Sequence, residues 1–162
     1  MKPILYIMCG PSGCGKTTWV KWFVQMKRNT QELFYVSRDE IRFEMLADDE
    51  EYFAHEKEVF SRFVQAIATT LQNNIDVIVD ATHLNEFSRR KLTQAIDMQG
   101  VTDYEIIYVA FTTPVDTCLA RNQLRSGRAQ VPENIIRNMC RDFRMPTVDE
   151  DERAIEVMVF DG

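Results

Sequence analysis

The sequence predicts an α/β fold in which a parallel five-stranded sheet is covered by helices on both faces. Short apolar runs alternate with longer segments of helical periodicity along the whole chain. A glycine-rich segment directly follows the first apolar run. Repeats, low-complexity tracts and linker-like stretches are absent from the sequence. We therefore expect one domain, residues 1–162, with its ligands above the carboxyl ends of the strands.

The expected elements follow in order from the residues. Runs rich in Val, Ile, Tyr and Phe predict strands, at 4–9, Leu33–Ser37, Val77–Val79, Tyr104–Phe111 and Ile155–Phe160. Helical periodicity predicts helices from Thr17 to Met26, Asp39 to about Leu46, about Tyr52 to Leu71, Asn85 to Met98 and Pro114 to Leu124, and one more beginning at Pro132. Proline is favoured where a helix begins, because its missing N–H would be unpaired there anyway. The loop Arg125–Val131 separates the last two helices.

The glycine-rich segment reads GPSGCGKTT and fits the phosphate-binding pattern G-x-x-x-x-G-K-[ST]. Its glycines let successive backbone N–H groups point at phosphate oxygens, and the helix that follows adds the positive end of its dipole. Lys16 is expected to reach the β- and γ-phosphates, and the Thr17 hydroxyl to ligate Mg²⁺. The expected nucleotide-binding residues are therefore Gly10, Pro11, Ser12, Gly13, Cys14, Gly15, Lys16, Thr17 and Thr18.

Composition is that of an ordinary soluble globule, with 45% hydrophobic and 27% charged residues. No apolar stretch approaches the roughly 20 residues that cross a bilayer, and the first residues lead into a strand rather than a signal peptide. We expect a cytoplasmic protein without membrane contact. The four cysteines lack the density and spacing of a disulfide framework or a zinc site. Cys14 is more simply a small loop residue than a reactive thiol.

The net charge of −6 argues against a general electrostatic grip on nucleic acid. Residues 121–144, however, hold six arginines against two acids, Glu133 and Asp142. Phosphate contact is the favoured interpretation of this arginine cluster. Residues 48–58 hold six acids against Lys57 alone, and a solvated face is the favoured interpretation there.

Two carboxylates follow predicted strands. Asp39 could accept a proton from an attacking hydroxyl, or could simply cap a helix. Arg42 lies one turn later on the same face, where it could pair with Asp39 or bind a substrate phosphate. Asp80 ends an apolar strand, which is the usual position of an aspartate that helps to hold Mg²⁺. His83 is expected to be structural or exposed, and His55 solvated.

Taken in order, the motifs resemble the kinase domain of the phage-type polynucleotide 5′-kinases, within the small P-loop kinases. The resemblance covers nearly the whole chain and rests on GPSGCGKTT, Ser37-Arg38-Asp39, Thr82-x-Leu84-Asn85, Arg121-Asn122 with Arg125, and Val131-Pro132. The lid loop is about one residue longer than in that family, so Arg125 and Arg128 are partly interchangeable. Such kinases often carry a C-terminal 3′-phosphatase, and nothing follows Gly162 here, so end healing is expected to stop at the kinase step.

The resemblance implies a single-domain P-loop kinase with a helical lid, about 121–144, that transfers phosphate from ATP with Mg²⁺ to a 5′-hydroxyl of DNA or RNA. It implies that Asp39 is the general base, that Arg125 stabilises the transferring phosphoryl group with Arg121 beside it, and that Thr17 and Asp80 place the metal. It also implies acceptor-binding residues, namely Arg38, Asp39, Arg42, Thr82 and Asn85. A small-molecule or nucleoside acceptor is the first alternative, and a nucleotide-dependent switch or assembly subunit without kinase activity is the second.

Overall fold

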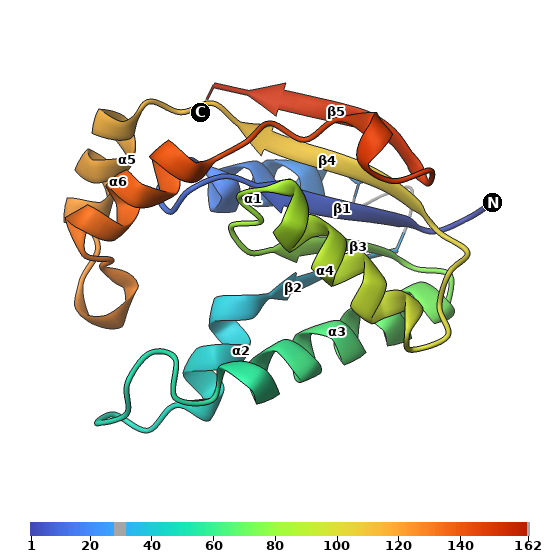
Figure 1. Cartoon of the computed structure of the whole chain (residues 1–162), viewed down its shortest axis with the longest axis horizontal. Coiled ribbons are helices and arrows are strands. Elements are labelled where there is room, and N and C mark those ends of the chain that lie inside the picture. Colours follow the sequence, from blue (N-terminus) through green and yellow to red (C-terminus); the bar gives the residue numbers. More distant parts are fainter. Residues whose placement is uncertain (28–31, 162) are drawn as a thin grey trace.

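The computed structural model of the chain describes residues 1–27 and 32–161. Gly162 lies outside these ranges. Five strands form one sheet, in chain order β1 (Ile4–Cys9), β2 (Leu33–Ser37), β3 (Asp76–Asp80), β4 (Glu105–Phe111) and β5 (Ala154–Phe160). The helices are α1 (Lys16–Lys27), α2 (Arg38–Met45), α3 (Glu56–Gln72), α4 (Glu86–Asp97), α5 (Val115–Gln123) and α6 (Glu133–Asp142), with 3₁₀ turns at Gly127–Ala129 and Val148–Glu150 (Figure 1).

The sheet has the order β2-β3-β1-β4-β5, and every neighbouring pair is parallel. The register pairs Ile7 with Val79 on one side and with Tyr108 on the other. Strand order reverses beside β1, because the chain passes from β1 to β2 on one side of the sheet and later returns to β4 on the other. Open parallel sheets bind their ligands at such a switch point, above the carboxyl ends of the strands.

The two faces of the sheet have separate cores, since neighbouring side chains of a strand point to opposite faces. Leu5, Ile7 and Cys9 pack with Phe63 of α3 and Leu92 of α4 in one cluster. The alternate residues of β1 pack on the other face with α1, α5 and α6, in a cluster that includes Tyr6, Met8, Trp19, Phe23, Cys118 and Ile136. This two-sided burial explains why the central strands read as continuous apolar runs.

The predicted fold class and all five strands are confirmed, with element ends that differ by one or two residues except in one case. The helix expected from about Tyr52 begins only at Glu56. The rings of Tyr52 and Phe53 pack against the guanidinium of Arg42, which draws this segment toward α2 and out of helical register. No helix within the described ranges is long and apolar enough to cross a membrane.

Candidate functional site

The phosphate-binding loop connects β1 to α1, as its sequence predicts. Gly13 and Gly15 have φ values of +83° and +108°, a backbone region that side chains with a Cβ rarely adopt. A Cβ on Gly13 would also lie 2.7 Å from the Cys118 carbonyl oxygen. The Nζ of Lys16 lies within the loop, 2.8 Å from the Gly10 carbonyl and 2.9 Å from that of Pro11. The Lys16 ammonium is thereby held within the turn that the two glycines allow.

Neighbouring segments hold this loop in place from three sides. The Gly10 N–H donates to the Thr82 carbonyl at 2.8 Å, which ties the loop to the end of β3. The Thr113 hydroxyl donates to the Cys14 carbonyl at 2.6 Å, which ties it to the connection between β4 and α5. Arg121 donates to the Gly13 carbonyl at 3.2 Å. The base of the lid is thus bonded directly to the loop.

Asp80 ends β3 and lines the same cleft as Thr17. Burial raises the pKa of its carboxyl, although the charges of Lys16 and Arg125 and a hydrogen bond from Tyr35 act against this rise. The Tyr35 hydroxyl donates to Asp80 Oδ2. Mg²⁺ commonly binds through one or two protein oxygens together with substrate phosphates and water. Thr17 and Asp80 fit this ligand set, and no group of three or more metal-binding side chains exists among the described residues.

Asp39 lies in the first turn of α2, but it does not cap the helix. Ser37 is the N-cap, and its hydroxyl accepts the Glu40 N–H at 3.3 Å. The Asp39 side chain is 58% exposed and faces the cleft. It accepts hydrogen bonds from Arg42 and from the Tyr52 hydroxyl. The helix-cap interpretation of Asp39 is therefore wrong, because another residue fills that role.

Arg42 is buried, and its guanidinium is shared among several groups. Glu56 accepts from its Nε at 3.1 Å and from its Nη2 at 2.8 Å. Its Nη1 donates to Asp39 and, at 2.6 Å, to the Tyr52 hydroxyl, while the Tyr52 ring lies 4.2 Å from the guanidinium carbon. Arg38 also donates to Glu56. Glu56 therefore holds both arginines of α2 in place. Of the two roles expected for Arg42, pairing with Asp39 is the one present in this structure.

The lid arginines have different partners. Arg128 donates to the Ala47 carbonyl at 2.6 Å and lies 3.4 Å from Asp48, so it joins the lid loop to the segment after α2. Arg125 lines the cleft and interacts electrostatically with Asp80. Its backbone N–H donates to the Asn122 carbonyl at 3.1 Å, but within the described residues its guanidinium forms no hydrogen bond or ion pair with a protein group. The structure thus separates two arginines that the sequence leaves interchangeable.

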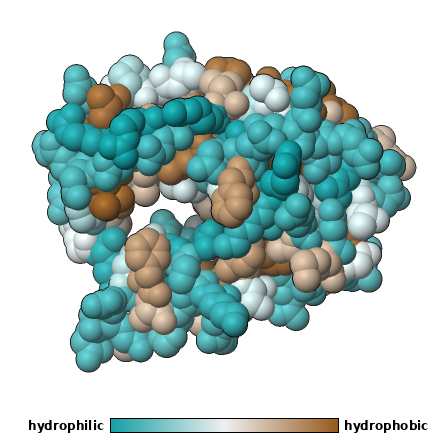
Figure 2. All heavy atoms as spheres, viewed as in Figure 1, coloured by the Kyte–Doolittle hydropathy of each residue, from teal (hydrophilic) through white to brown (hydrophobic). Residues whose placement is uncertain are grey.

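These groups converge on one cleft of about 880 Å³ at the carboxyl edge of the sheet. Figure 2 shows the molecule hollowed between the lid with α6 above and the segment after α2 below. Six cationic residues line it, namely Lys16, Arg38, Arg42, Arg121, Arg125 and Arg128, against four acids, Asp39, Glu50, Glu56 and Asp80. The cleft lining thus carries a formal charge of about +2 in a chain of net charge −6. This local excess of positive charge suits a polyphosphate.

Several sequence predictions need correction here. Asn85 is not among the residues that line the cleft; its side chain accepts the Ser88 N–H at 2.9 Å and caps α4. The cleft lining also lacks the last three arginines of the cluster, Arg137, Arg141 and Arg144. Each bonds to a group on α6 or just after it: Arg137 to Glu133, Arg141 to Asp142, and Arg144 to the carbonyls of Arg141 and Phe143. The cluster is therefore divided, with Arg121, Arg125 and Arg128 in the cleft lining and the other three outside it.

The site also contains groups that no sequence motif marks. Glu56 and Glu50 belong to the acidic stretch 48–58, which was expected to be a solvated face, yet both line the cleft. Tyr35 and Tyr52 carried no recognisable signal, since their roles arise only when distant segments meet. His83 is buried, as the structural interpretation of it expects, and its Nδ1 lies 2.9 Å from the Met8 carbonyl oxygen.

Comparison with known protein families identifies the chain. The sequence model of the AAA_33 family, described as an AAA domain, matches residues 5–146. The chain belongs to this family. No curated protein sequence matches it significantly. Membership of a nucleotide-binding family agrees with the loop geometry described above.

Solved structures share the fold at low sequence identity. The Pnkp1/Rnl/Hen1 RNA repair complex contains a chain that matches with 22% identity and a TM-score of 0.72. The match covers 87% of this protein but only 44% of that chain. Chaetomium thermophilum Kti12 in complex with ADP-AlF3 has 16% identity and a TM-score of 0.70, and the match covers 97% of this protein and 88% of Kti12. A sugar kinase from Janibacter sp. has 14% identity and a TM-score of 0.66, with 99% and 86% covered. The shared architecture is that of P-loop kinases.

Proposed function

We propose that this AAA domain protein is an ATP-dependent kinase that phosphorylates the 5′-hydroxyl of a polynucleotide end. The observation that carries the proposal is the arrangement around Asp39. An exposed carboxylate with no capping role lines one cleft with Lys16 of the phosphate-binding loop and with Arg125 of the lid. A carboxylate beside a nucleotide site is suited to accept a proton from an acceptor hydroxyl.

In the proposed reaction, Asp39 accepts the proton of the 5′-hydroxyl while the hydroxyl oxygen forms a bond to the γ-phosphorus. The bond between the γ-phosphorus and the bridging oxygen breaks, and ADP leaves. Lys16 and the loop N–H groups hold the triphosphate in line with the acceptor. Arg125 neutralises charge on the transferring phosphoryl oxygens. Mg²⁺, held by Thr17 and Asp80, would supply further charge neutralisation to the phosphates when bound.

Arg42 is proposed to contact the phosphate on the 3′ side of the terminal nucleotide. Its Nη1 bonds to Asp39 in this structure, and Glu56 holds the other edge of the guanidinium. When Asp39 turns to the acceptor hydroxyl, one Nη1 hydrogen stays on the Tyr52 hydroxyl and the other is released to donate to a phosphate oxygen. The contact orients the 5′-hydroxyl toward Asp39, one turn away on the same helix.

A small-molecule acceptor is the second candidate, and one observation favours it. Glu56 neutralises much of the charge of Arg42, and Glu50 adds another acid to the acceptor end of the cleft. An uncharged hydroxyl compound would bind there without electrostatic repulsion. The Janibacter neighbour, a sugar kinase of the same fold, shows that the architecture is compatible with such acceptors.

The two candidates differ in their dependence on a 3′-phosphate. If the acceptor is a polynucleotide end, a nucleoside 3′-monophosphate should be a better substrate than the nucleoside by about ten- to two-hundredfold in kcat/KM, because an arginine–phosphate pair is worth about 1.5 to 3 kcal/mol. Arg42→Ala should erase this preference and spare activity on the plain nucleoside. A parent protein that shows no preference would favour the small-molecule candidate instead.

A further inference from the structure

Two cationic side chains from different helices lie against one aromatic ring beside the cleft. Arg38 lines the cleft, and its guanidinium carbon lies 5.1 Å from the centre of the Phe60 ring of α3. The Nζ of Lys91, which belongs to α4, lies 5.0 Å from the centre of the same ring. Arg38 and Lys91 therefore both lie against the Phe60 ring beside the cleft, and Arg38 also pairs with Glu56.

Lys91 differs from its neighbour Arg90, which has an acidic partner on the same helix. Arg90 pairs with Glu86 one turn away. Lys91 is exposed, and in the described part of the chain its side chain contacts no carboxylate. A solvated cation held over a ring beside an active-site cleft is placed to meet an anionic group of a ligand.

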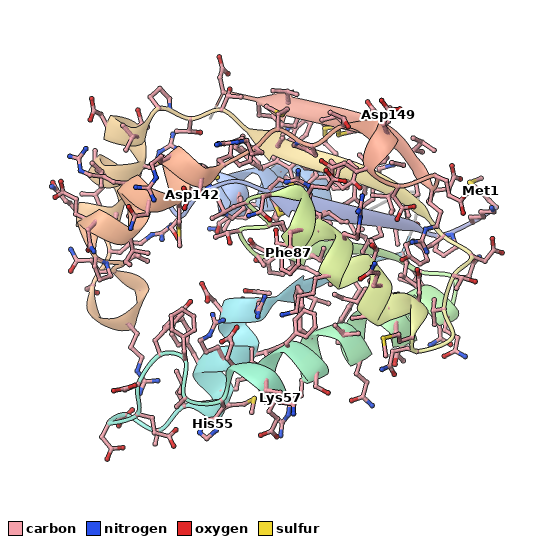
Figure 3. All side chains as sticks on the ribbon, viewed as in Figure 1. Met1, His55, Lys57, Phe87, Asp142 and Asp149 are labelled. Carbon is pink, nitrogen blue, oxygen red and sulfur yellow. The ribbon has the colours of Figure 1, made fainter. Side chains whose placement is uncertain are left out.

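Phe87 adds an exposed aromatic surface to this region. Its side chain is 78% exposed in the first turn of α4, immediately after the loop that brings Ala81 and Thr82 to the cleft. Figure 3 shows it at the end of α4 that borders the opening. Phe87 and Lys91 are four residues apart on the helix, so they lie on the same face with about 6 Å between their Cβ atoms.

We propose that Arg38, Phe60, Phe87 and Lys91, which we name the acceptor strip, bind the nucleotides adjacent to the terminal one of a single-stranded acceptor. Phe87 stacks on a base, and Lys91 and Arg38 contact backbone phosphates. Single-stranded nucleic acids are bound by this combination of aromatic stacking and cationic side chains. The inference rests on the proposed polynucleotide function and names where the strand continues beyond the catalytic cleft.

The charge of the whole chain limits how far the strand is bound. At a net charge of −6, the surface outside the cleft and the strip repels phosphates on average. The strip holds one exposed cation, Lys91, one partly buried cation, Arg38, that pairs with Glu56, and one exposed ring, Phe87. These groups suffice for one or two nucleotides. We therefore expect kcat/KM to rise with acceptor length and to level off at about three nucleotides.

The test measures kcat/KM for a series of 5′-hydroxyl acceptors, from a nucleoside 3′-monophosphate to a hexanucleotide. Phe87→Ala should lower kcat/KM for the hexanucleotide about tenfold, through KM, and leave the mononucleotide unchanged. Phe87→Trp should retain the parental value, because it keeps the stacking surface. Phe34→Ala, which removes an exposed ring of β2 outside the strip, is the matched control and should have no effect.

Lys91→Ala provides an independent measurement. It should weaken binding of a fluorescent 5′-phosphorylated hexanucleotide, followed by anisotropy, and lower the slope of log affinity against log salt by about 0.7. Lys57→Ala is the control, since Lys57 is an exposed lysine on the side of α3 that faces away from α4 in Figure 3. Equal slopes for the parent and Lys91→Ala would overturn the phosphate contact.

These measurements separate the strip from the proposed function. If the parent phosphorylates the mononucleotide and the hexanucleotide equally well and Phe87→Ala changes neither rate, the strip is refuted and the kinase function stands. If the hexanucleotide binds in a manner that depends on Phe87 but is not phosphorylated, the strip stands and the proposed function falls. If the parent neither binds nor phosphorylates the hexanucleotide, both are refuted.

Discussion

Replacement of Asp39 by asparagine tests the chemistry of the site with little disturbance of the fold. Ser37, not Asp39, caps α2. Arg42 keeps its three hydrogen bonds to Glu56 in the variant, and the asparagine oxygen can still accept from Nη1. The lost ion pair involves a carboxylate that is 58% exposed. We therefore expect the free energy of unfolding to change by less than about 1 kcal/mol.

The expected effect on turnover is much larger. Asparagine cannot accept the acceptor proton, so kcat should fall by roughly two to four orders of magnitude, or about 3 to 5 kcal/mol of transition-state stabilisation. Asp39 lies on α2, away from the phosphate-binding loop, so the affinity for ATP should stay close to the parental value. Single-turnover phosphoryl transfer and equilibrium nucleotide binding measure the two quantities separately.

Glu40→Gln is the matched control, because Glu40 is the neighbouring exposed acid of α2 and is absent from the cleft lining. It should leave both kcat and nucleotide affinity unchanged. If Asp39→Asn turns over within about threefold of the parent, Asp39 is not the general base, and the account of the acceptor side must be abandoned. A parallel loss of ATP affinity would instead indicate that the substitution deforms the nucleotide site.

Three further predictions address the loop, the lid and a buried histidine. Lys16→Ala should reduce transfer to every acceptor by more than about tenfold while thermal unfolding stays nearly parental. Arg125→Ala should lower kcat by roughly a thousandfold. Arg128→Ala, which removes the contacts to Ala47 and Asp48, should change KM more than kcat, and reversed effects in steady-state assays would exchange the roles of the two arginines. Burial lowers the pKa of His83 to about 4 from an ordinary value of 6.5, so the unfolded chain binds the extra proton between these pH values and stability falls as the pH drops through them. His83→Asn keeps a residue that tolerates the positive φ of this position. Urea unfolding at about pH 7 and about pH 4 should show that the variant loses on the order of 3 kcal/mol less stability between these pH values than the parent does. An equal loss in both proteins would assign the pH dependence to other groups.

The nucleotide half of the site could be predicted from the sequence because its geometry is local. Residues 4–18 form a strand, a turn and a helix start from consecutive residues, and the spacing within GPSGCGKTT encodes the position of Lys16 and Thr17. The alternation of strands and helices likewise predicts a parallel sheet, since right-handed crossovers leave few other arrangements.

The acceptor half was only partly predictable, because contacts between distant segments define it. Glu56 is one acid among six in residues 48–58, and nothing in that stretch marks it as the partner of Arg38 and Arg42. The choice between Arg125 and Arg128 likewise depends on where the lid meets Ala47. Asn85 was assigned to substrate from a motif resemblance, although asparagine before a helix is also a common N-cap.

Transfer of the γ-phosphoryl group of ATP to a 5′-hydroxyl oligonucleotide tests the central claim most directly. Radiolabelled ATP, Mg²⁺ and matched oligonucleotides that end in a 5′-hydroxyl or a 5′-phosphate would be incubated with the parent protein, with Lys16→Ala and with Asp39→Asn. The account predicts label only on the 5′-hydroxyl oligonucleotide, only with the parent protein, and in a form that a 5′-phosphatase removes. Absence of labelled oligonucleotide with the parent, while nucleosides or sugars become labelled under the same conditions, would contradict it.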